Sequence, residues 1–411
     1  MSIYLETYGC TMNKADSEII KALLRPQITE SLEEADIAII NSCGVKGPTE
    51  HKIRKRIEEI KATNKPLIVA GCLPKISDLD VNVVGTNVYD IVEAVQKVRE
   101  GSAVHIIRDE KKNKLCYPRV GDGVNAIIPI SEGCLGSCTY CAARFARGHL
   151  YSYPLESIVK TAREFISNGY KELQITSQDT GCYGTDLDAG ERLHSLLEKL
   201  ASLEGKFRIR VGMMNPNHTL DILEDLVSVY RHDKIYKFLH IPVQSGNDHI
   251  LQAMNRKYTV DEFLTVCRAF RTEFPELYLC TDVIVGFPTE TEEQFHDTLA
   301  LVKKINPDKI NVTRFSPRPK TEASKMPQIP DWIKKERSRL LYKLRMDISL
   351  SINRRYVGES HEVLINQEGT VSPTMIGRLS NYKPVVCVGS MGSFSRVTIT
   401  GAAPTYLKAL Q

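Results

Sequence analysis

The chain has 411 residues, of which 42% are hydrophobic and 25% charged, and its formal net charge is +4. This composition excludes a disordered or fibrous chain, and the length predicts two or three globular domains. No run of eighteen apolar residues is present and the N-terminus has no signal-peptide pattern, so we expect a cytoplasmic protein without a membrane partner.

The first part of the chain alternates short strand-like runs with helix-like stretches. The strand-like runs are 2–7, 35–41 and 66–70, and the helix-like stretches are 16–24, 49–62 and 88–99. This order predicts a small parallel sheet with helices on both faces. We assign residues 1–110 to this N-terminal domain.

A cysteine follows each of these three strand-like runs: Cys10, Cys43 and Cys72. Residues just past the carboxyl ends of parallel strands converge in space, so the three thiols are predicted to form one site. Cysteine is also a common small buried residue, which is the competing interpretation. Eleven cysteines in a chain expected in the cytoplasm favour metal or redox chemistry over disulfides.

A second group of cysteines, Cys134, Cys138 and Cys141, has the spacing C-x3-C-x2-C and follows the strand-like run 125–131. A closed structural zinc site takes four ligands, usually in two pairs, whereas this loop offers three. Three thiolates leave one iron of an iron–sulfur cluster open to bind another molecule, which suits catalysis. Three buried structural cysteines are the alternative.

The segment 120–345 repeats the alternation of strands and helices on a larger scale. Its strand-like runs are 126–131, 172–177, 208–213, 238–242, 277–285 and 309–315, and its helical patterns include 155–167, 191–203, 220–230, 260–274 and 292–304. Six such units predict a partial TIM-like (βα)6 barrel, in which the chemistry gathers at the carboxyl ends of the strands. Those ends carry the second cysteine loop and several polar loops, although polar loops are normal at any barrel rim.

The C-terminal part differs from the rest of the chain in its hydrophobic pattern and its charge. A helix-like stretch at 332–355 precedes short alternating runs at 361–365, 385–388 and 395–400, which predict a small antiparallel β-barrel at 346–411. From residue 331 onward, 12 Lys and Arg face 6 Asp and Glu, so this region is basic. Concentrated basic charge on a terminal β-module is typical of nucleic-acid binding, although a solvated charged helix accounts for part of it.

The second cysteine loop, with aromatic Tyr140 before its last cysteine, resembles that of radical S-adenosylmethionine (SAM) enzymes. Together with the segments 7–13, 41–43 and 70–72, it resembles the methylthiotransferase family. The resemblance covers essentially the whole chain, and the C-terminal part is similar to a TRAM domain. The stretch 377–386 is most similar to the archaeal and eukaryotic branch, which modifies threonylcarbamoyladenosine beside the anticodon of tRNA. The membrane anchor of the eukaryotic members has no counterpart here, so an archaeal-type soluble enzyme is expected.

The resemblance implies two 4Fe-4S clusters and SAM as cofactors. Cys134, Cys138 and Cys141 hold the cluster that binds and cleaves SAM, and the resulting radical takes hydrogen from C2 of adenine, a position inert to acid–base catalysis. Cys10, Cys43 and Cys72 hold the second cluster, which carries sulfur methylated by another SAM. The implied partners are tRNA, an electron donor protein and a sulfur donor.

The resemblance also implies roles for individual side chains. The expected SAM contacts are Tyr140, Ser177, Gln178, Asp179, Gln244, Ser245, Ile284 and Gly286. Arg147 is expected to contact either the SAM carboxylate or the sulfur-bearing site. A cation is expected to pair with the carboxylate of the threonylcarbamoyl group, and the candidates are Arg314, Arg318 and Lys320. The expected contacts with tRNA phosphates and bases are Arg378, Tyr382, Lys383 and Arg396, with Tyr382 alternatively a core residue.

Two positions depart from the family pattern: Ala143-Arg144 replaces the usual Val-Pro, and Lys320 stands where the family usually has Gly. Other functions remain open at this point. They are methylthiolation of isopentenyladenosine in tRNA, methylthiolation of an aspartate in a ribosomal protein, and a nonenzymatic iron–sulfur protein that binds RNA or acts as a sensor.

Overall fold

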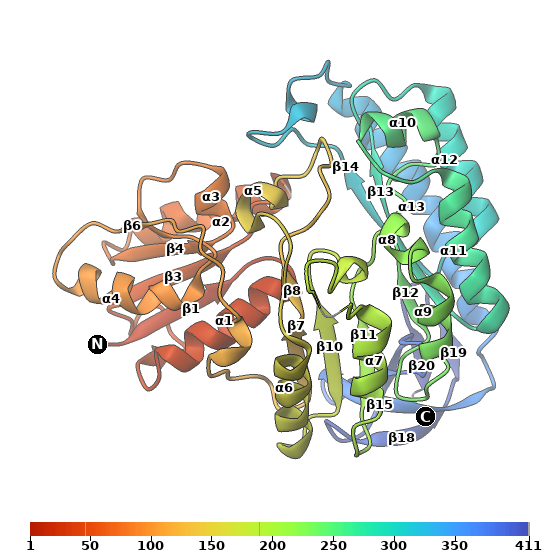
Figure 1. The fold of residues 1–411 in the computed structure, drawn as a ribbon, viewed down its shortest axis with the longest axis horizontal. Coiled ribbons are helices and arrows are strands. Elements are labelled where there is room, and N and C mark those ends of the chain that lie inside the picture. The colour runs from red at the N-terminus through yellow and green to blue at the C-terminus, as the bar shows by residue number, and fades with distance from the viewer. Residues whose placement is uncertain (46, 189, 410–411) are drawn as a thin grey trace.

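The computed structural model describes residues 1–45, 47–188 and 190–409 and contains three parts in chain order. Figure 1 shows an N-terminal sheet on the left, a larger curved sheet with outer helices in the middle and on the right, and a C-terminal sheet at the lower right. The predicted fold class is confirmed in each part. Among the described residues, none of the helices combines the length and the apolar character that crossing a bilayer requires.

The N-terminal part is a parallel sheet of six strands in the order β2-β1-β3-β4-β5-β6. Its strands are β1 Ile3–Thr7, β2 Ile28–Thr29, β3 Ile37–Ser42, β4 Leu67–Gly71, β5 Asn82–Val84 and β6 His105–Ile106. Its helices are α1 Thr11–Leu23, α2 Gly47–Lys61, α3 Leu73–Ile76 and α4 Ile91–Arg99. The sequence predicted three of the strands and missed β2, β5 and β6, because two or three residues are too few to show a periodic pattern.

Helices cover both faces of this sheet, as alternation along β3 shows. Ile37 and Ile39 are buried in a cluster with residues of α1 and α4, whereas Ala38 and Ile40 are buried in a separate cluster with residues of α2. Successive side chains of a strand point to opposite faces, so a strand covered on both faces is apolar throughout.

Helix α1 begins directly after Cys10, five residues earlier than the sequence pattern predicted. Its first turns bury the polar residues Asn13, Asp16 and Ser17. These side chains face other polar groups, so the apolar periodicity that marks an ordinary buried helix is absent there. The start of the helix was missed because the site occupies its inner face.

The central part contains six parallel strands in chain order. They are β7 Asn125–Pro129, β10 Glu172–Thr176, β11 Arg208–Val211, β12 Phe238–His240, β13 Tyr278–Val285 and β14 Lys309–Arg314. They form two three-stranded sheets, and a parallel bridge between Ile209 and Ile235 joins β11 to the β12 side. A short antiparallel pair, β8 Ser131–Glu132 with β9 Tyr151–Ser152, follows β7. This arrangement is the predicted partial barrel.

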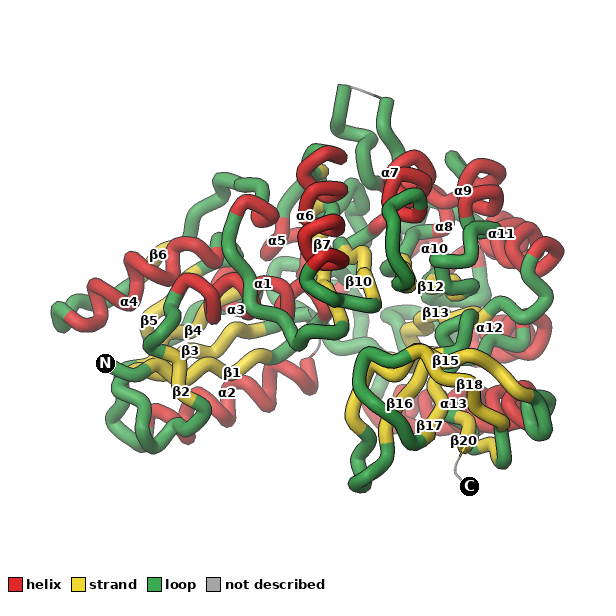
Figure 2. Tube along the Cα trace, turned by 90° about the horizontal axis from the view of Figure 1, so that it is seen from below, coloured by secondary structure: helices red, strands yellow, loops and turns green. Residues whose placement is uncertain are grey.

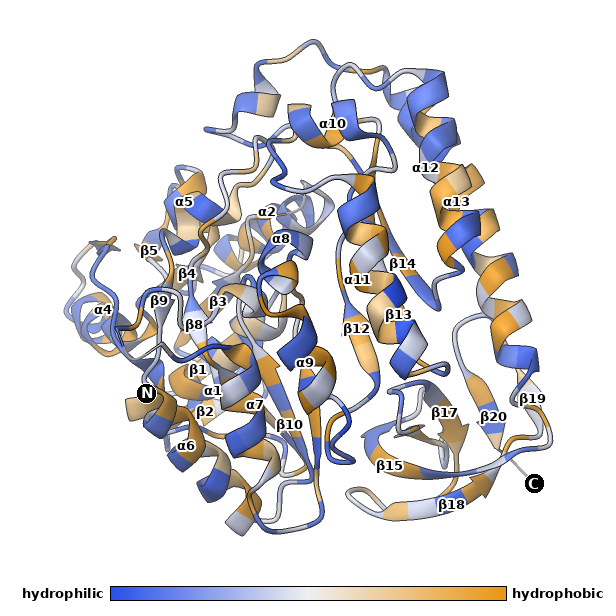
Figure 3. Ribbon diagram, turned by 45° about the vertical axis from the view of Figure 1, so that its right-hand side comes forward, coloured by the Kyte–Doolittle hydropathy of each residue, from blue (hydrophilic) through white to orange (hydrophobic). Residues whose placement is uncertain are grey.

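Helices follow the barrel strands and pack on their outer side (Figure 1). They are α5 Ala143–Arg147, α6 Leu155–Ser167, α7 Leu193–Ala201, α8 Pro216–Leu220, α9 Leu223–Val229, α10 Asp248–Ala253, α11 Val260–Glu273 and α12 Glu292–Ile305. Single-turn 3-10 helices occur at η1 Val88–Asp90, η2 Lys114–Cys116, η3 Thr180–Cys182 and η4 Glu322–Ser324. The predicted helix 220–230 corresponds to α9, which is shorter at both ends, and α8 ends at Leu220, the first residue of that range. Figure 3 shows hydrophobic residues along β10 and β12, where these helices cover the sheet.

Helix α13, Asp331–Arg354, leads from the barrel into the C-terminal sheet. It packs along β14, and Figure 3 shows hydrophobic and hydrophilic residues mixed along its length. The predicted domain boundary between residues 345 and 346 lies inside this helix.

The C-terminal sheet has six strands in the order β18-β15-β16-β17-β20-β19. They are β15 Ser360–Glu368, β16 Met375–Arg378, β17 Pro384–Cys387, β18 Phe394–Thr398, β19 Gly401–Ala402 and β20 Leu407–Ala409. All neighbouring pairs are antiparallel except β17 with β20, so the prediction of a purely antiparallel module is corrected at that pair. Figure 2 shows this sheet folded around itself beside the barrel strands.

Candidate active site

The second cysteine loop lies past the carboxyl ends of β7 and β8, where a barrel places its chemistry. Gln178 supports it by accepting a 2.6 Å hydrogen bond from the backbone N–H of Gly133. Gly133 has φ +87°, and a Cβ there would lie 1.9 Å from the carbonyl oxygen of His149, so the turn requires glycine. On its other side, the N–H of Thr139 bonds to the carbonyl oxygen of Met254 at 3.1 Å.

Arg256 contacts this loop directly. One guanidinium nitrogen donates to the Sγ of Cys138 at 3.1 Å, and its Nε donates to the hydroxyl of Tyr258 at 3.1 Å. Another nitrogen donates to the side-chain oxygen of Asn215. This contact could not be predicted from the sequence, because Arg256 follows a short helix, α10, and lies 118 residues from Cys138.

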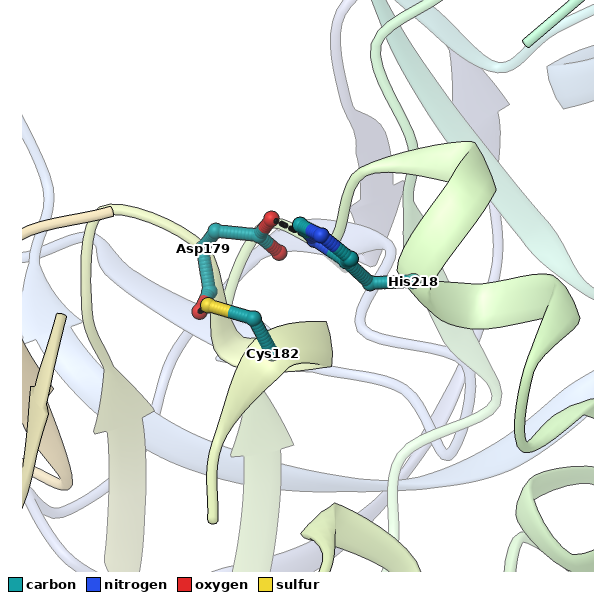
Figure 4. Close-up of side chains that lie close together, drawn as sticks. All are labelled: Asp179, Cys182 and His218. Carbon is teal, nitrogen blue, oxygen red and sulfur yellow. Dashed lines mark hydrogen bonds and ion pairs between the residues drawn. The ribbon is translucent and has the colours of Figure 1, made fainter. Parts of the chain in front are cut away.

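Asp179 continues this chain of hydrogen bonds below the loop. Its carboxylate accepts from the Asn215 side chain at 2.6 Å and pairs with Nδ1 of His218 at 2.6 Å (Figure 4). Two backbone N–H groups, of Gly181 and Asn215, complete its bonding at 3.0 Å. Burial alone would raise the pKa of Asp179, but these donors lower it below its ordinary value. Asp179 is fully buried, and the expectation that it contacts SAM stays a prediction.

The first cysteine group lies at the ends of three neighbouring strands, as predicted. Cys10 follows β1 and is exposed, whereas Cys43 after β3 and Cys72 after β4 are buried. Burial raises the pKa of Cys43 to about 12, with further contributions from Cys72 and Cys10 nearby. Gly9 has φ +130°, and a Cβ on it would lie 2.6 Å from the Cβ of Cys43. The backbone therefore approaches this site as closely as glycine allows.

The donor sets fit iron–sulfur clusters better than single metal ions. A zinc ion binds thiolates at about 2.3 Å, so its ligand atoms lie within roughly 4 Å of one another. Among the described residues, the Asp179, Cys182 and His218 group is the only set of three such ligand atoms that lie within 4.8 Å of one another. The thiols of neither cysteine triplet converge that closely. Wider spacing suits a cluster in which each thiolate binds a different iron.

A ring of four buried charges joins the two cysteine groups. Arg147 lies 2.7 Å from both Asp16 and Glu132, and Lys114 lies 2.9 Å from Asp16 and 3.1 Å from Glu132. The four side chains are at most 4% exposed. Burial alone would raise the pKa of Asp16, but Arg147 and Lys114 outweigh it and hold this pKa below its ordinary value. Two cations balance two carboxylates, so the ring stays charged without water.

Arg147 also lies beside the N-terminal cysteines. Burial raises the pKa of the Cys72 thiol, and Arg147 opposes this effect through its charge and a hydrogen bond. Of the two locations expected for Arg147, the structure therefore gives the one next to the first cysteine group.

A cavity of 820 Å³ opens between the two cysteine groups. Cys141 and Tyr140 line one part of it, and Val45 and Gly47, which follow Cys43 by two and four residues, line another. The remaining lining residues come from α2, from the barrel strands and the loops after them, and from α13, and they include His240, Gln244, Asp282, Ile284, Asn311, Arg314, Arg318, Arg339 and Tyr342. The cavity thus brings together three of the expected SAM contacts, Tyr140, Gln244 and Ile284.

The other expected SAM contacts lie outside this lining. Ser245 is fully buried, and its hydroxyl accepts from the N–H of Asn247 at 3.3 Å. The hydroxyl of Ser177 accepts from the N–H of Asp179 at 3.0 Å. Gly286 has φ +70°, and a Cβ there would lie 2.4 Å from Lys334 of α13, so this glycine allows the close approach of that helix.

His240 and Asp282 are polar residues of the barrel strands that the sequence did not single out. Nε2 of His240 lies 3.1 Å from Oδ2 of Asp282, and the Asn311 amide donates to Oδ1 at 2.5 Å. Burial alone would lower the pKa of His240, but Cys280 and Asp282 outweigh it and raise it to about 10. A polar residue within a strand of an otherwise apolar barrel is the sequence signal by which His240 and Asp282 could have been found.

The three cations expected to meet the substrate have different surroundings. Arg314 is exposed and lines the cavity. Arg318 is buried and bonded to Glu50 and to the carbonyl oxygen of Gly44, so it holds the turn after Cys43. Lys320 has φ +66°, lies outside the cavity lining, and donates to the carbonyl oxygen of Lys75 at 3.2 Å. Of the three, only Arg314 is free to meet a ligand in the cavity.

The residues of the C-terminal sheet that are expected to bind tRNA differ in how far they are buried. Lys383 is 1% exposed, and its ammonium lies 2.7 Å from Asp308 and 2.8 Å from Asn353, so the expectation that it contacts RNA is corrected. The ring of Tyr382 packs against Tyr236 and Phe238 of the barrel side, which fits the alternative that Tyr382 is a core residue.

Arg378 and Arg396 lie in different surroundings in the same sheet. The guanidinium of Arg378 lies 4.7 Å from the Tyr382 ring centre, and Arg378 lines a groove beside α1. Arg396 is exposed on β18.

Comparison with known families agrees with this architecture. Residues 128–302 match the radical SAM superfamily, residues 2–91 match the uncharacterized protein family UPF0004, and residues 354–410 match the TRAM domain. The fold is similar to the radical SAM methyltransferase TsrM of Kitasatospora setae, with a TM-score of 0.59 at 13% identity over 79% of this chain and 77% of that one. Fold and site together define a radical SAM protein.

Relatives that match almost the whole of this chain identify a particular family among the radical SAM proteins. The chain is 47% identical to the probable threonylcarbamoyladenosine tRNA methylthiotransferase of Pyrococcus horikoshii, over 99% of this chain and 98% of the relative. It is 34% identical to the threonylcarbamoyladenosine tRNA methylthiotransferase of Homo sapiens, over 99% of this chain and 73% of the relative. The chain belongs to the threonylcarbamoyladenosine tRNA methylthiotransferase family, and the resemblance predicted from its motifs is confirmed. The alternatives with isopentenyladenosine or a ribosomal aspartate are not favoured.

Proposed function

We propose that this enzyme converts N6-threonylcarbamoyladenosine, next to the anticodon of tRNA, to its 2-methylthio derivative, using SAM and two 4Fe-4S clusters. The observation that carries the proposal is the cavity of 820 Å³, because its lining includes Cys141 of one triplet and Val45 and Gly47, which follow Cys43 of the other triplet by two and four residues. An adenine in this cavity lies between both groups of thiols. The names of the relatives support the choice of base.

The two cysteine triplets have separate tasks in this proposal. Cys134, Cys138 and Cys141 hold the SAM-cleaving cluster, and Cys10, Cys43 and Cys72 hold the sulfur-bearing cluster. When bound, these clusters and SAM supply the radical that removes the C2 hydrogen and the methylated sulfur that replaces it. The chain itself orients these groups and keeps the reacting volume enclosed.

Individual residues of the chain contribute to binding and alignment. Tyr140, Gln244 and Ile284 border SAM, with Ser177, Gln178, Ser245 and Gly286 shaping the strand ends behind them. Arg147 holds the sulfur-bearing site and fixes its position relative to the cysteine loop through Asp16 and Glu132, 2.7 Å from each. Arg378 and Arg396 contact tRNA phosphates.

The proposal extends to domains, partners and location. The N-terminal domain comprises residues 1–110, the radical SAM domain 120–345 and the RNA-binding domain 346–411, and the family matches to 2–91, 128–302 and 354–410 support this division. A protein electron donor and a sulfur donor serve the clusters. The enzyme acts in the cytoplasm, where its tRNA substrate is found.

Single-cysteine variants test the division of labour. We expect Cys138→Ala to abolish SAM cleavage, whereas Cys43→Ala retains cleavage and loses sulfur insertion. Cys116→Ala is the matched control, since Cys116 is an exposed cysteine outside both triplets. The measurements are 5′-deoxyadenosine release and methylthio nucleoside in digested tRNA. Methylthio product from Cys43→Ala would show that the two-cluster proposal is wrong.

Iron analysis gives a second, independent readout. Anaerobically purified protein should contain about eight irons per chain if both triplets hold 4Fe-4S clusters. Cys138→Ala and Cys43→Ala should each lose about half of that iron, whereas Cys116→Ala should keep all of it. A content near four in the unaltered protein would leave only one cluster.

A further inference from the structure

We propose that Arg339 of α13, together with Arg314, recognises the carboxylate of the threonylcarbamoyl group and so makes the enzyme specific for this nucleoside. This inference rests on the proposed function. It adds Arg339, which is far from every motif in the sequence, and it excludes two other candidate cations.

The guanidinium groups of Arg314 and Arg339 are available to bind a ligand. Within the part of the chain that the structure describes, Arg314 and Arg339 have no hydrogen-bond or ion-pair partner, and both line the cavity. The other cations near this wall are occupied: Arg318 by Glu50, Arg337 by Glu290, Lys334 by Asp331, and Arg345 by the carbonyl oxygen of Ile310. An anion entering the cavity therefore meets these two arginines as its free cationic partners.

Helix α13 places Arg339 on the wall of the cavity, close to Arg314. Ser338, Arg339 and Tyr342 all line the cavity, and residues three or four apart share one face of a helix. Helix α13 packs along β14, whose last residue is Arg314. The two arginines thus come from neighbouring elements, and the hydroxyl groups of Ser338 and Tyr342 offer further hydrogen bonds on the same wall.

The substrate carries a carboxylate on its N6 substituent, at a distance from the reacting carbon C2. In adenine, N1 separates C2 from the carbon that bears N6, so an N6 substituent extends away from the reacting carbon. A base with C2 directed toward the cysteines therefore carries its substituent toward the rest of the cavity. The threonylcarbamoyl group ends in a carboxylate and a hydroxyl, and guanidinium groups bind carboxylates in paired, charge-assisted hydrogen bonds. An unmodified adenine leaves these cations without a partner.

Binding of anticodon stem-loops to the full-length protein tests this inference. Three RNAs of one sequence are compared: with threonylcarbamoyladenosine, with its carboxylate as a methyl ester, and with unmodified adenosine. We expect the first to bind at least about tenfold more tightly than the other two, because charge-assisted hydrogen bonds have this size. In Arg339→Gln combined with Arg314→Gln, the preference should fall to about one, because the stem-loop with threonylcarbamoyladenosine loses the affinity that its carboxylate adds.

Control variants separate a specific contact from general charge. Lys335→Gln removes a cation from an exposed position of the same helix that does not line the cavity, and it should keep the full preference. Arg339→Lys keeps the charge but loses the planar fork, so an intermediate preference is expected. Unchanged discrimination in the double variant would overturn the inference. It would also be overturned if the double variant lost SAM affinity and kept its preference among RNAs, because the arginines would then serve SAM.

The proposed function is tested by product formation in the unaltered enzyme, independently of the arginine variants. If unaltered enzyme forms 2-methylthio product from tRNA with threonylcarbamoyladenosine, the function stands whatever the arginine variants show. If it forms none while the binding preference is present, the reaction assignment fails and the recognition site remains.

Discussion

Arg256 donates a hydrogen bond of 3.1 Å to the sulfur of Cys138, the middle cysteine of the C-x3-C-x2-C loop. The same guanidinium is held by Asn215 and Tyr258, so its position is fixed from two further elements. Hydrogen bonds to cluster sulfurs stabilise the reduced, more negative state and thereby raise the reduction potential.

We therefore predict that Arg256→Gln makes the SAM-cleaving cluster harder to reduce. Loss of a charged hydrogen bond corresponds to a shift on the order of −50 mV for a one-electron couple. The potential is read from a redox titration followed by electron paramagnetic resonance, with iron content as the control for cluster loss. Arg268→Gln, an exposed substitution on α11, serves as the matched variant. An unchanged potential in Arg256→Gln with full iron content would contradict the prediction.

The buried charge ring predicts a large stability effect at the domain junction. Asp16→Asn leaves Arg147 and Lys114 with one carboxylate between them, and breaking a buried pair costs about 3 to 5 kcal/mol. Asp36→Asn is the control, since its pairing with the N-terminus is half exposed and contributes little. Chemical unfolding of the cluster-free proteins measures both. Equal losses in the two variants would mean that the ring does not hold the domains together.

The pH dependence of stability is predicted to contain a contribution from Glu18 of α1. Burial raises the pKa of this carboxyl to about 8, and one of its oxygens has no hydrogen-bond partner among the described residues. Between its unfolded pKa, near 4.5, and 8, only the folded state keeps the proton, so stability falls as pH rises through this window and then levels off.

Glu18→Gln should remove this slope, which amounts to at most about 5 kcal/mol since one pKa unit equals about 1.4 kcal/mol. Free energies of unfolding measured at several pH values between 5 and 9 provide the check. Glu336→Gln alters an exposed carboxylate of α13 and should leave the slope in place.

Lys383 forms a buried ion pair with Asp308, so we predict that it contributes to stability and not to RNA binding. Lys383→Ala leaves Asp308 buried without its 2.7 Å partner and should destabilise the protein by about 3 to 5 kcal/mol. Arg396→Ala, on the exposed edge strand β18, should leave the melting temperature nearly unchanged but weaken tRNA binding and lower its salt dependence. The prediction fails if Lys383→Ala melts normally and loses tRNA affinity.

Much of the fold could be read from periodicity. The strands β1, β3 and β4 and the six barrel strands were predicted because each has an apolar or alternating run of several residues. The start of α1 and the strands β2, β5 and β6 could not be predicted, since the former buries polar residues and the latter are two or three residues long. Of the site, both cysteine triplets were visible, because their spacing and their positions after strands are local features.

The sequence by itself determined the family, the two cysteine triplets and the order of the domains, since these are written in short, contiguous patterns. The tertiary structure decided which cations are free and which are occupied. Arg318 and Lys383 carry the same charge in the sequence as Arg339, yet folding buries the first two against Glu50 and Asp308 and leaves Arg339 facing the cavity. Contacts such as that of Arg256 with Cys138 join residues 118 positions apart, and only the packing of the barrel brings them together.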